Sequence, residues 1–124
     1  PPEVQGIGIH TKTIKQITLT DNQSSATDTG IYLPGFYDKG VRITYKMNRG
    51  SKYRTGVFTI SAAGEHASSN DDYEESNGDV GATLSVKTSD GDSTAGNDTI
   101  RVQYITTSDS GNNVTMEYQV QILV

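Results

Sequence analysis

The stretch RGSKYRTG, residues 49–56, holds the side chains of this chain that are best suited to gripping an acidic group. Arginine donates paired hydrogen bonds to a carboxylate in a fixed planar geometry, and a neighbouring tyrosine adds a flat ring. Six of the ten basic residues lie between Lys39 and Arg54, where there is no acid, whereas nine of the fifteen acids lie between Glu65 and Asp98. The net charge of −5 argues against a nucleic-acid partner.

The two arginines of this stretch have a structural and a ligand-binding interpretation. Side chains two residues apart in a strand point to the same side, so we expect Arg54 to share the buried face of Phe58. Its guanidinium would then lie at the rim of the core and form a bidentate pair with a carboxylate such as Asp72 or Glu75. Charges of this kind are more often structural than functional, so we interpret Arg49 and Arg54 as a structural clasp or interface.

Residues suited to catalysis or metal binding are scarce. His10 and His66 both lie in polar surroundings, no serine occupies a nucleophile elbow, and there is no cysteine. The acidic runs 71–75 and 90–98 are rich in oxygen atoms, but the second departs from the EF-hand pattern. We predict no enzyme, no cofactor and no metal site, and calcium in one of these acidic loops stays open as an alternative.

Residues 31–38 hold three aromatic side chains around a Pro-Gly turn. A glycan could stack on Tyr37 while Asp38 accepts hydrogen bonds from its hydroxyls, and Tyr53 offers a second ring. Aromatic residues of this kind more often pack in cores or subunit interfaces. Glycan binding through Tyr37, Asp38 and Tyr53 is therefore the secondary interpretation.

The elements that would position these residues are strands. The chain contains nineteen Ile and Val residues but only four Leu, together with abundant Thr and seven Tyr. β-Branched and aromatic side chains favour a pleated sheet over a helix. The composition predicts an all-β protein.

Alternation of apolar and polar residues, typical of half-buried antiparallel strands, locates the elements. It predicts one hairpin formed by residues 41–47 and 56–61, with a connection at 48–52, and a closing hairpin formed by residues 100–104 and 114–122. A further strand is expected at 80–86, short strands around Tyr32 and Tyr73, and a strand at 14–19 with a bulge near residues 15–16. Polar composition predicts loops at 21–30, 62–70 and 88–98.

These elements predict a single antiparallel β-sandwich or jelly-roll-like domain of seven to eight short strands spanning residues 1–124. Residues 1–40 are expected to form an N-terminal strand or loop extension, and the chain to be a fragment of a longer one. No apolar run reaches the roughly 18 residues of a membrane-spanning helix. We therefore expect no membrane partner.

Four blocks between residues 41 and 124 occur in a distinctive order. They are Tyr45, Arg49-Gly50, Tyr53-Arg54-Thr55-Gly56 and Ile60; Asp72-Tyr73-Glu74-Glu75; Val80-Gly81-Ala82-Thr83-Leu84-Ser85; and residues 100–104, 106–108, Gly111 and 115–118. In this order they resemble the C-terminal β-rich domains of tailed-bacteriophage tail fibres, tailspikes and related virion structural proteins.

The resemblance implies a virion domain at a fibre tip or on the capsid surface, assembled in the host cytoplasm and exposed on the extracellular particle. It implies a homotrimer and supplies no catalytic residue, and it leaves open whether the domain binds a host receptor such as a bacterial surface glycan, trimerises the fibre or decorates the capsid. The basic hairpin of one protomer could dock onto the acidic stretch of the next, with Arg49, Arg54, Asp72 and Glu75 at the contact. The alternative is a non-catalytic, calcium-stabilised carbohydrate-binding module of a secreted protein.

Overall fold

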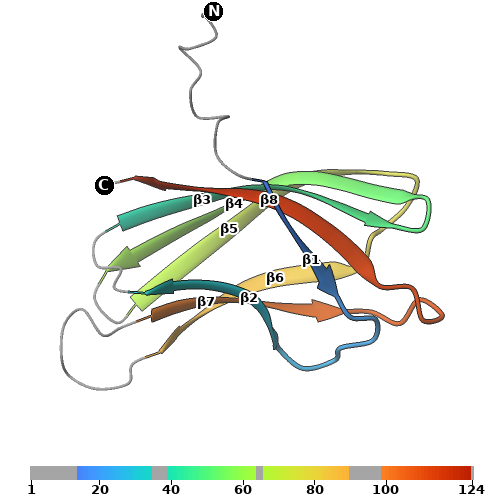
Figure 1. Ribbon diagram of the computed structural model, residues 1–124, viewed down its shortest axis with the longest axis horizontal. Helices are drawn as coiled ribbons and strands as arrows, with labels where there is room; N and C mark the ends of the chain where they lie inside the picture. The colour runs from blue at the N-terminus through green and yellow to red at the C-terminus, as the bar shows by residue number, and fades with distance from the viewer. Residues whose placement is uncertain (1–13, 35–38, 64–65, 90–98, 124) are drawn as a thin grey trace, which may run out of the picture.

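The computed structural model describes residues 14–34, 39–63, 66–89 and 99–123, and within these ranges the chain is all-β, as predicted. The described residues form eight strands in two antiparallel sheets that pack on each other as a β-sandwich (Figure 1). The strands are β1 (Lys15–Leu19), β2 (Thr27–Pro34), β3 (Lys39–Arg49), β4 (Lys52–Ala63), β5 (His66–Ser76), β6 (Ala82–Ser89), β7 (Thr99–Thr106) and β8 (Val114–Leu123).

The two sheets differ in size. The larger has the strand order β1-β8-β3-β4-β5 and the smaller the order β2-β7-β6, and Figure 1 shows them as an upper and a lower layer. Residues 15–34 thus supply one strand to each sheet, so they belong to the body of the sandwich and do not form an extension.

The core lies between the sheets and follows the predicted alternation. On β3, Val41, Ile43, Tyr45 and Met47 are buried, while the intervening Arg42, Thr44 and Lys46 are exposed. The same period of two runs through β4, β7 and β8. The buried apolar residues are Leu19, Ile31, Leu33, Val41, Ile43, Tyr45, Met47, Phe58, Ile60, Ala62, Val80, Ala82, Leu84, Ile100, Val102, Tyr104, Val114, Met116 and Tyr118.

The predicted hairpin of β3 and β4 is present, and its connection is a tight two-residue turn. Arg49 pairs with Lys52 across Gly50-Ser51, and Gly50 has a φ of 61°. A positive φ at the first turn residue is typical of the type II′ turn, whose twist matches that of the flanking strands.

The predicted loop at 62–70 was wrong, because β4 runs to Ala63 and β5 begins at His66. β5 is the edge strand of the larger sheet and is polar on both faces, with exposed residues such as Ser68 and Ser69 on opposite sides. Such a strand lacks the apolar alternation by which strands are recognised, so its composition resembled that of a loop.

The predicted closing hairpin was also wrong. β7 pairs with β2 and β6, whereas β8 pairs with β1 and β3 in the other sheet. The polar residues 107–113 therefore connect the two sheets. Turn composition shows that the chain reverses direction but does not reveal which sheet it enters next.

The predicted bulge in the first strand is absent, since Lys15–Leu19 pair with β8 in continuous register. The register shift lies in β2, between Asp28 and Tyr32, where Gly30 has a φ of 91°. β2 begins at Thr27, inside the predicted loop 21–30, because its irregular start breaks the alternation.

Candidate functional site

Of the three predicted ligand-binding residues, the described structure contains one. Tyr37 and Asp38 lie outside the described ranges. Tyr53 stands near the start of β4, and its side chain lies on the outer face of the larger sheet with 36% of the residue exposed.

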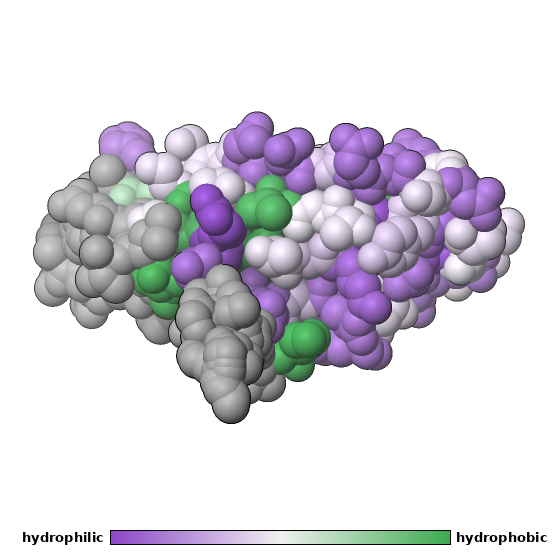
Figure 2. All heavy atoms as spheres, turned by 90° about the horizontal axis from the view of Figure 1, so that it is seen from above, coloured by the Kyte–Doolittle hydropathy of each residue, from purple (hydrophilic) through white to green (hydrophobic). Residues whose placement is uncertain are grey.

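The register of β3, β4 and β5 aligns polar side chains in rows across this outer face. Tyr53 lies between Asn48 on β3 and Ser76 on β5, and the next row contains Lys46, Thr55 and Glu74. Figure 2 looks onto this face, where hydrophilic and intermediate surface predominates over much of the view. The face of the larger sheet therefore presents hydroxyls, amides and carboxylates at the regular spacing of a pleated sheet.

Two adjoining hollows cross this face. The first, of about 210 Å³, is lined by Ile14, Lys46, Tyr53 and Glu117 among others. The second, of about 370 Å³, is lined by Val57, Asp72, Tyr73 and Glu74, and both are bordered by Thr44 and Thr55. We call the two hollows together the outer trough.

The charges of the outer trough are unequal. Lys46 forms an ion pair with Glu117, Nζ to Oε1 3.0 Å, and this contact raises the pKa of Lys46. Asp72 and Glu74 are exposed carboxylates on β5. The trough therefore has acidic acceptors at one end and an aromatic ring near the other, an arrangement suited to a hydroxyl-rich ligand without negative charge.

Arg54, on the opposite face of β4, is 1% exposed and contacts Glu75. Its Nε and Nη2 both donate to Oε2 of Glu75, at 2.9 and 2.7 Å, so the two nitrogens share one oxygen instead of forming the predicted bidentate pair. The side chain of Tyr73 covers the guanidinium, with Cζ 3.9 Å from the ring centroid. Asp72, the other predicted partner, is exposed on the outer face and does not join this contact.

Arg54 also links the two sheets. Its Nη1 donates to the carbonyl oxygen of Ala82 on β6 at 2.7 Å. Oε2 of Glu75 accepts a third hydrogen bond, from the backbone N–H of Val80 at 2.9 Å. The Arg54–Glu75 pair therefore holds the segment 77–81, which carries the chain from β5 in one sheet to β6 in the other and which we call the crossover.

Arg49, which is 2% exposed, holds the crossover from its other side. Nη1 donates to the carbonyl of Val80 at 2.9 Å, Nη2 to that of Thr107 at 2.7 Å, and Nε to that of Asn112 at 2.9 Å. Nη2 also contacts Oδ1 of Asp21 at 2.5 Å. Arg49, predicted to belong to a clasp, therefore contacts four acceptors from three segments, and neither Asp72 nor Glu75 is among these acceptors.

Two buried or part-buried carboxylates show opposite pKa shifts. The hydrogen bond from the backbone N–H of Asp109 lowers the pKa of Asp21, and the N–H of Gly111 and the guanidinium of Arg49 lower it further. Burial raises the pKa of Asp71, although Tyr45 donates a hydrogen bond to its Oδ1 at 2.7 Å. Burial and this contact also raise the pKa of Tyr45.

These shifts predict opposite pH effects for two matched substitutions. Because the folded pKa of Asp21 is lowered, its contribution to stability is present above its unfolded pKa, about 3.9, and is lost as the pH falls. Asp21→Asn should therefore destabilise at neutral pH, with a penalty that shrinks on acidification. Because the folded pKa of Asp71 is raised, native Asp71 loses stability as the pH rises, so Asp71→Asn should gain relative stability from acid to neutral pH.

Urea unfolding of both variants and the parent chain, from pH 3 to pH 7, measures these differences (a pH range that brackets the reference carboxyl pKa). The assigned shifts would be contradicted if the unfolding free energies of the two variants, each relative to the parent chain, changed with pH in the same direction.

Comparisons with known proteins do not place the chain in a family: no protein-family model matches it, and no curated protein matches it. Among the described residues, no group of three or more His, Cys, Asp or Glu side chains is arranged to hold a metal ion. The part of the chain that the structure describes also contains no helix long and apolar enough to cross a membrane. The acidic run 90–98 lies outside the described ranges.

Proposed function

We propose that this domain is a non-catalytic adhesion module of a bacteriophage virion, at a fibre tip or on the capsid surface, and that its outer trough binds a bacterial surface glycan. The observation that carries the proposal is the exposed ring of Tyr53 beside two adjoining hollows on the outer face of the larger sheet, the second of which is lined by Asp72 and Glu74. The virion setting rests on the resemblance of residues 41–124 described above.

The trough favours a neutral glycan over an anionic one. Carboxylates accept hydrogen bonds from sugar hydroxyls, and Asp72 and Glu74 are both exposed at the trough. An aromatic face offers a sugar ring a rigid apolar surface at small entropic cost. An anionic sugar would meet the uncompensated charge of the two acids and be repelled.

Replacing the ring tests the proposal. Tyr53→Ala should weaken glycan binding about tenfold, because an aromatic contact of roughly 1.5 kcal/mol is lost. The measurement is a screen of immobilised neutral and acidic bacterial glycans, followed by calorimetric titration of the best binder.

Tyr32→Ala is the matched control, since Tyr32 is 51% exposed but lies on β2 in the smaller sheet. Equal losses of glycan affinity in the two variants, or an unchanged affinity in Tyr53→Ala, would mean that the outer trough is not the glycan site.

Homo-oligomeric assembly is the second part of the proposal, and a trimer is the form that the resemblance implies. The described contacts leave the basic hairpin little free charge for a neighbouring subunit, because Lys46, Arg49 and Arg54 contact acids of their own chain. A trimer would therefore need a surface other than the pairing of hairpin and acidic stretch. Light scattering of the purified chain gives its mass directly, and a monomeric mass at every concentration would reject this part.

A further inference from the structure

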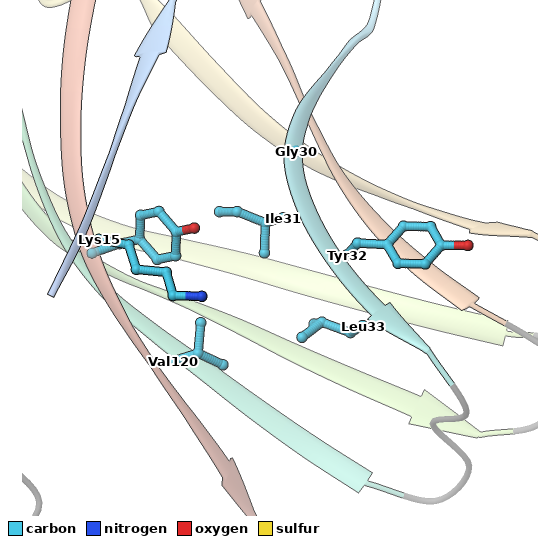
Figure 3. Close-up of a pocket in the computed structure, with 7 residues that line it drawn as sticks. Lys15, Gly30, Ile31, Tyr32, Leu33 and Val120 are labelled. Carbon is cyan, nitrogen blue, oxygen red and sulfur yellow. The ribbon is translucent and has the colours of Figure 1, made fainter. Parts of the chain in front are cut away.

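The sandwich has an open side between β2 and β8, which the outer trough does not use. β1 pairs with β8 only as far as Lys15 and Tyr118, while β8 continues to Leu123. A cavity of about 350 Å³ opens there, lined by residues of β1, β2 and β8. Figure 3 shows Ile31, Leu33 and Val120 pointing into this space from the two sheets, with the ammonium group of Lys15 extending between Ile31 and Val120 and Tyr32 directed away.

Within the described ranges, the strand edge beside this opening carries none of the usual protection against pairing with another strand. Beyond Gln119, no strand of the described chain pairs with the side of β8 that faces away from β3. Residues 119–123, with the sequence QVQIL, contain no charge and no proline, and Ile122 is 41% exposed. Natural proteins usually protect such an edge with charges, bulges or proline, because it is a template for pairing with another strand.

The other edges of the two sheets carry that protection. β5 bears four acids within residues 71–75, β6 bears an exposed lysine at position 87, and β2 combines a register shift with a positive-φ glycine. β1 begins with Lys15. Because the other described edges are protected and this one is not, it is the edge best suited to pairing with another strand.

We propose that two copies of this chain associate through antiparallel pairing of their β8 edges, with a two-fold axis at Gln121. In this register Gln121 lies opposite the same residue of the second copy, and Val120 lies opposite Ile122. Directly opposed residues of antiparallel strands share a face, so Val120 and Ile122 of both copies fall on the cavity side and Gln121 on the opposite side.

The alternation of apolar and polar residues along this edge is self-complementary, which favours a second copy of this chain as the strand that pairs with it. A two-fold contact requires one patch to match itself, and the alternation of residues 119–123 does so without placing like charges opposite each other. Pairing through β5 of another copy would instead bring a neutral strand against an acidic one, with no compensating base. The joined β8 strands would make the two larger sheets continuous and place the second copy's Val120 and Ile122 over the open side.

A charge on the edge tests this contact. Sedimentation equilibrium of the parent chain, from micromolar to millimolar concentration, should show a mass rising from 13.3 kDa toward the dimer. Ile122→Lys should raise the dimer dissociation constant about tenfold or more, because it places an unpaired charge in a strand junction. Ile105→Lys should leave it unchanged, since Ile105 is 39% exposed but lies on β7 beside the groove formed with residues of β4, β5 and β6.

Hydrogen exchange of the unmodified chain gives a second readout that does not depend on a variant's folding. Raising the concentration should slow exchange at those amides of residues 120–122 that point away from β3, and leave exchange in β5 unchanged. A parent chain that stays monomeric at millimolar concentration would overturn the proposal. So would a dimer or trimer whose mass is unchanged by Ile122→Lys and whose exchange at residues 120–122 does not depend on concentration. Neither result bears on glycan binding by the outer trough.

Discussion

Arg54→Ala is expected to lower the free energy of unfolding by about 3–5 kcal/mol, the range seen when one member of a buried ion pair is removed. The size of the effect follows from what the guanidinium leaves behind. Oε2 of Glu75 loses two of its three hydrogen-bond donors, and the carbonyl of Ala82 loses its inter-sheet donor. The ring of Tyr73 would then cover a void, because Arg54 fills the space beneath it.

The substitution should also loosen the crossover. Val80 is fixed through its N–H by Glu75, whose position depends on Arg54, and through its carbonyl by Arg49. Hydrogen exchange at residues 80–82 should therefore accelerate in Arg54→Ala more than exchange in the centre of β8.

Chemical denaturation monitored by tyrosine fluorescence or circular dichroism measures the change in unfolding free energy. Arg42→Ala is the matched control: it lies in the same hairpin, is exposed, and should change stability by no more than about 0.5 kcal/mol. Arg54→Lys keeps the charge but not the planar fork, so it should recover only part of the loss. If Arg54→Ala altered ligand binding while stability stayed unchanged, the interpretation as a clasp would be wrong.

The inward direction of Arg54 could be predicted from the sequence because it depends on local alternation, whereas its nearly complete burial was not predicted. The residue shares the phase of Phe58 and Ile60, and a strand's period of two places all three on one face. Glu75 was within reach of this reasoning because β5 follows β4 as the next strand along the chain. The predicted bidentate geometry was wrong, because the geometry of this contact also depends on backbone groups such as the N–H of Val80.

The contacts of Arg49 could not be predicted in the same way. Its acceptors Asp21, Thr107 and Asn112 belong to turns that meet only because β7 and β8 lie in opposite sheets. The sequence predicted a simple hairpin there, and a hairpin gives no reason for Asp21 to lie beside its turn. The pairing of Tyr45 with Asp71 was missed for a related reason: it depends on β5, whose polar alternation was interpreted in part as a loop.

The outer trough was only partly predictable. Tyr53 stood out as an aromatic residue in a polar stretch, but its neighbours across the sheet are set by register. Thr55 faces Lys46 on one side and Glu74 on the other. A one-residue shift of a partner strand would replace its residue beside Thr55 by one that faces inward in this structure, so the site required the three-dimensional pairing.

Gly81→Ala is expected to destabilise the domain by roughly 2–4 kcal/mol, through backbone strain and overpacking together. Gly81 has a φ of 75°, a conformation that alanine adopts at a cost of roughly 1 kcal/mol. A Cβ atom at this position would overlap Oγ1 of Thr107 and lie 3.1 Å from Nη1 of Arg49. Neither neighbour can withdraw freely, because Arg49 is held by acceptors on several segments and the backbone N–H of Thr107 donates to the carbonyl of Gly81 at 2.9 Å.

Gly111→Ala separates the two causes. Gly111 has a comparable φ of 86°, but a Cβ there would meet nothing within 4 Å, so this variant should show the conformational cost alone, about 1 kcal/mol. The excess loss in Gly81→Ala then measures the overlap at the crossover, and Thr107→Ala in the same chain should recover part of it because the overlapping hydroxyl is removed. Equal losses at the two glycines, with no recovery in the double variant, would mean that the crossover is not tightly packed against Arg49 and Thr107.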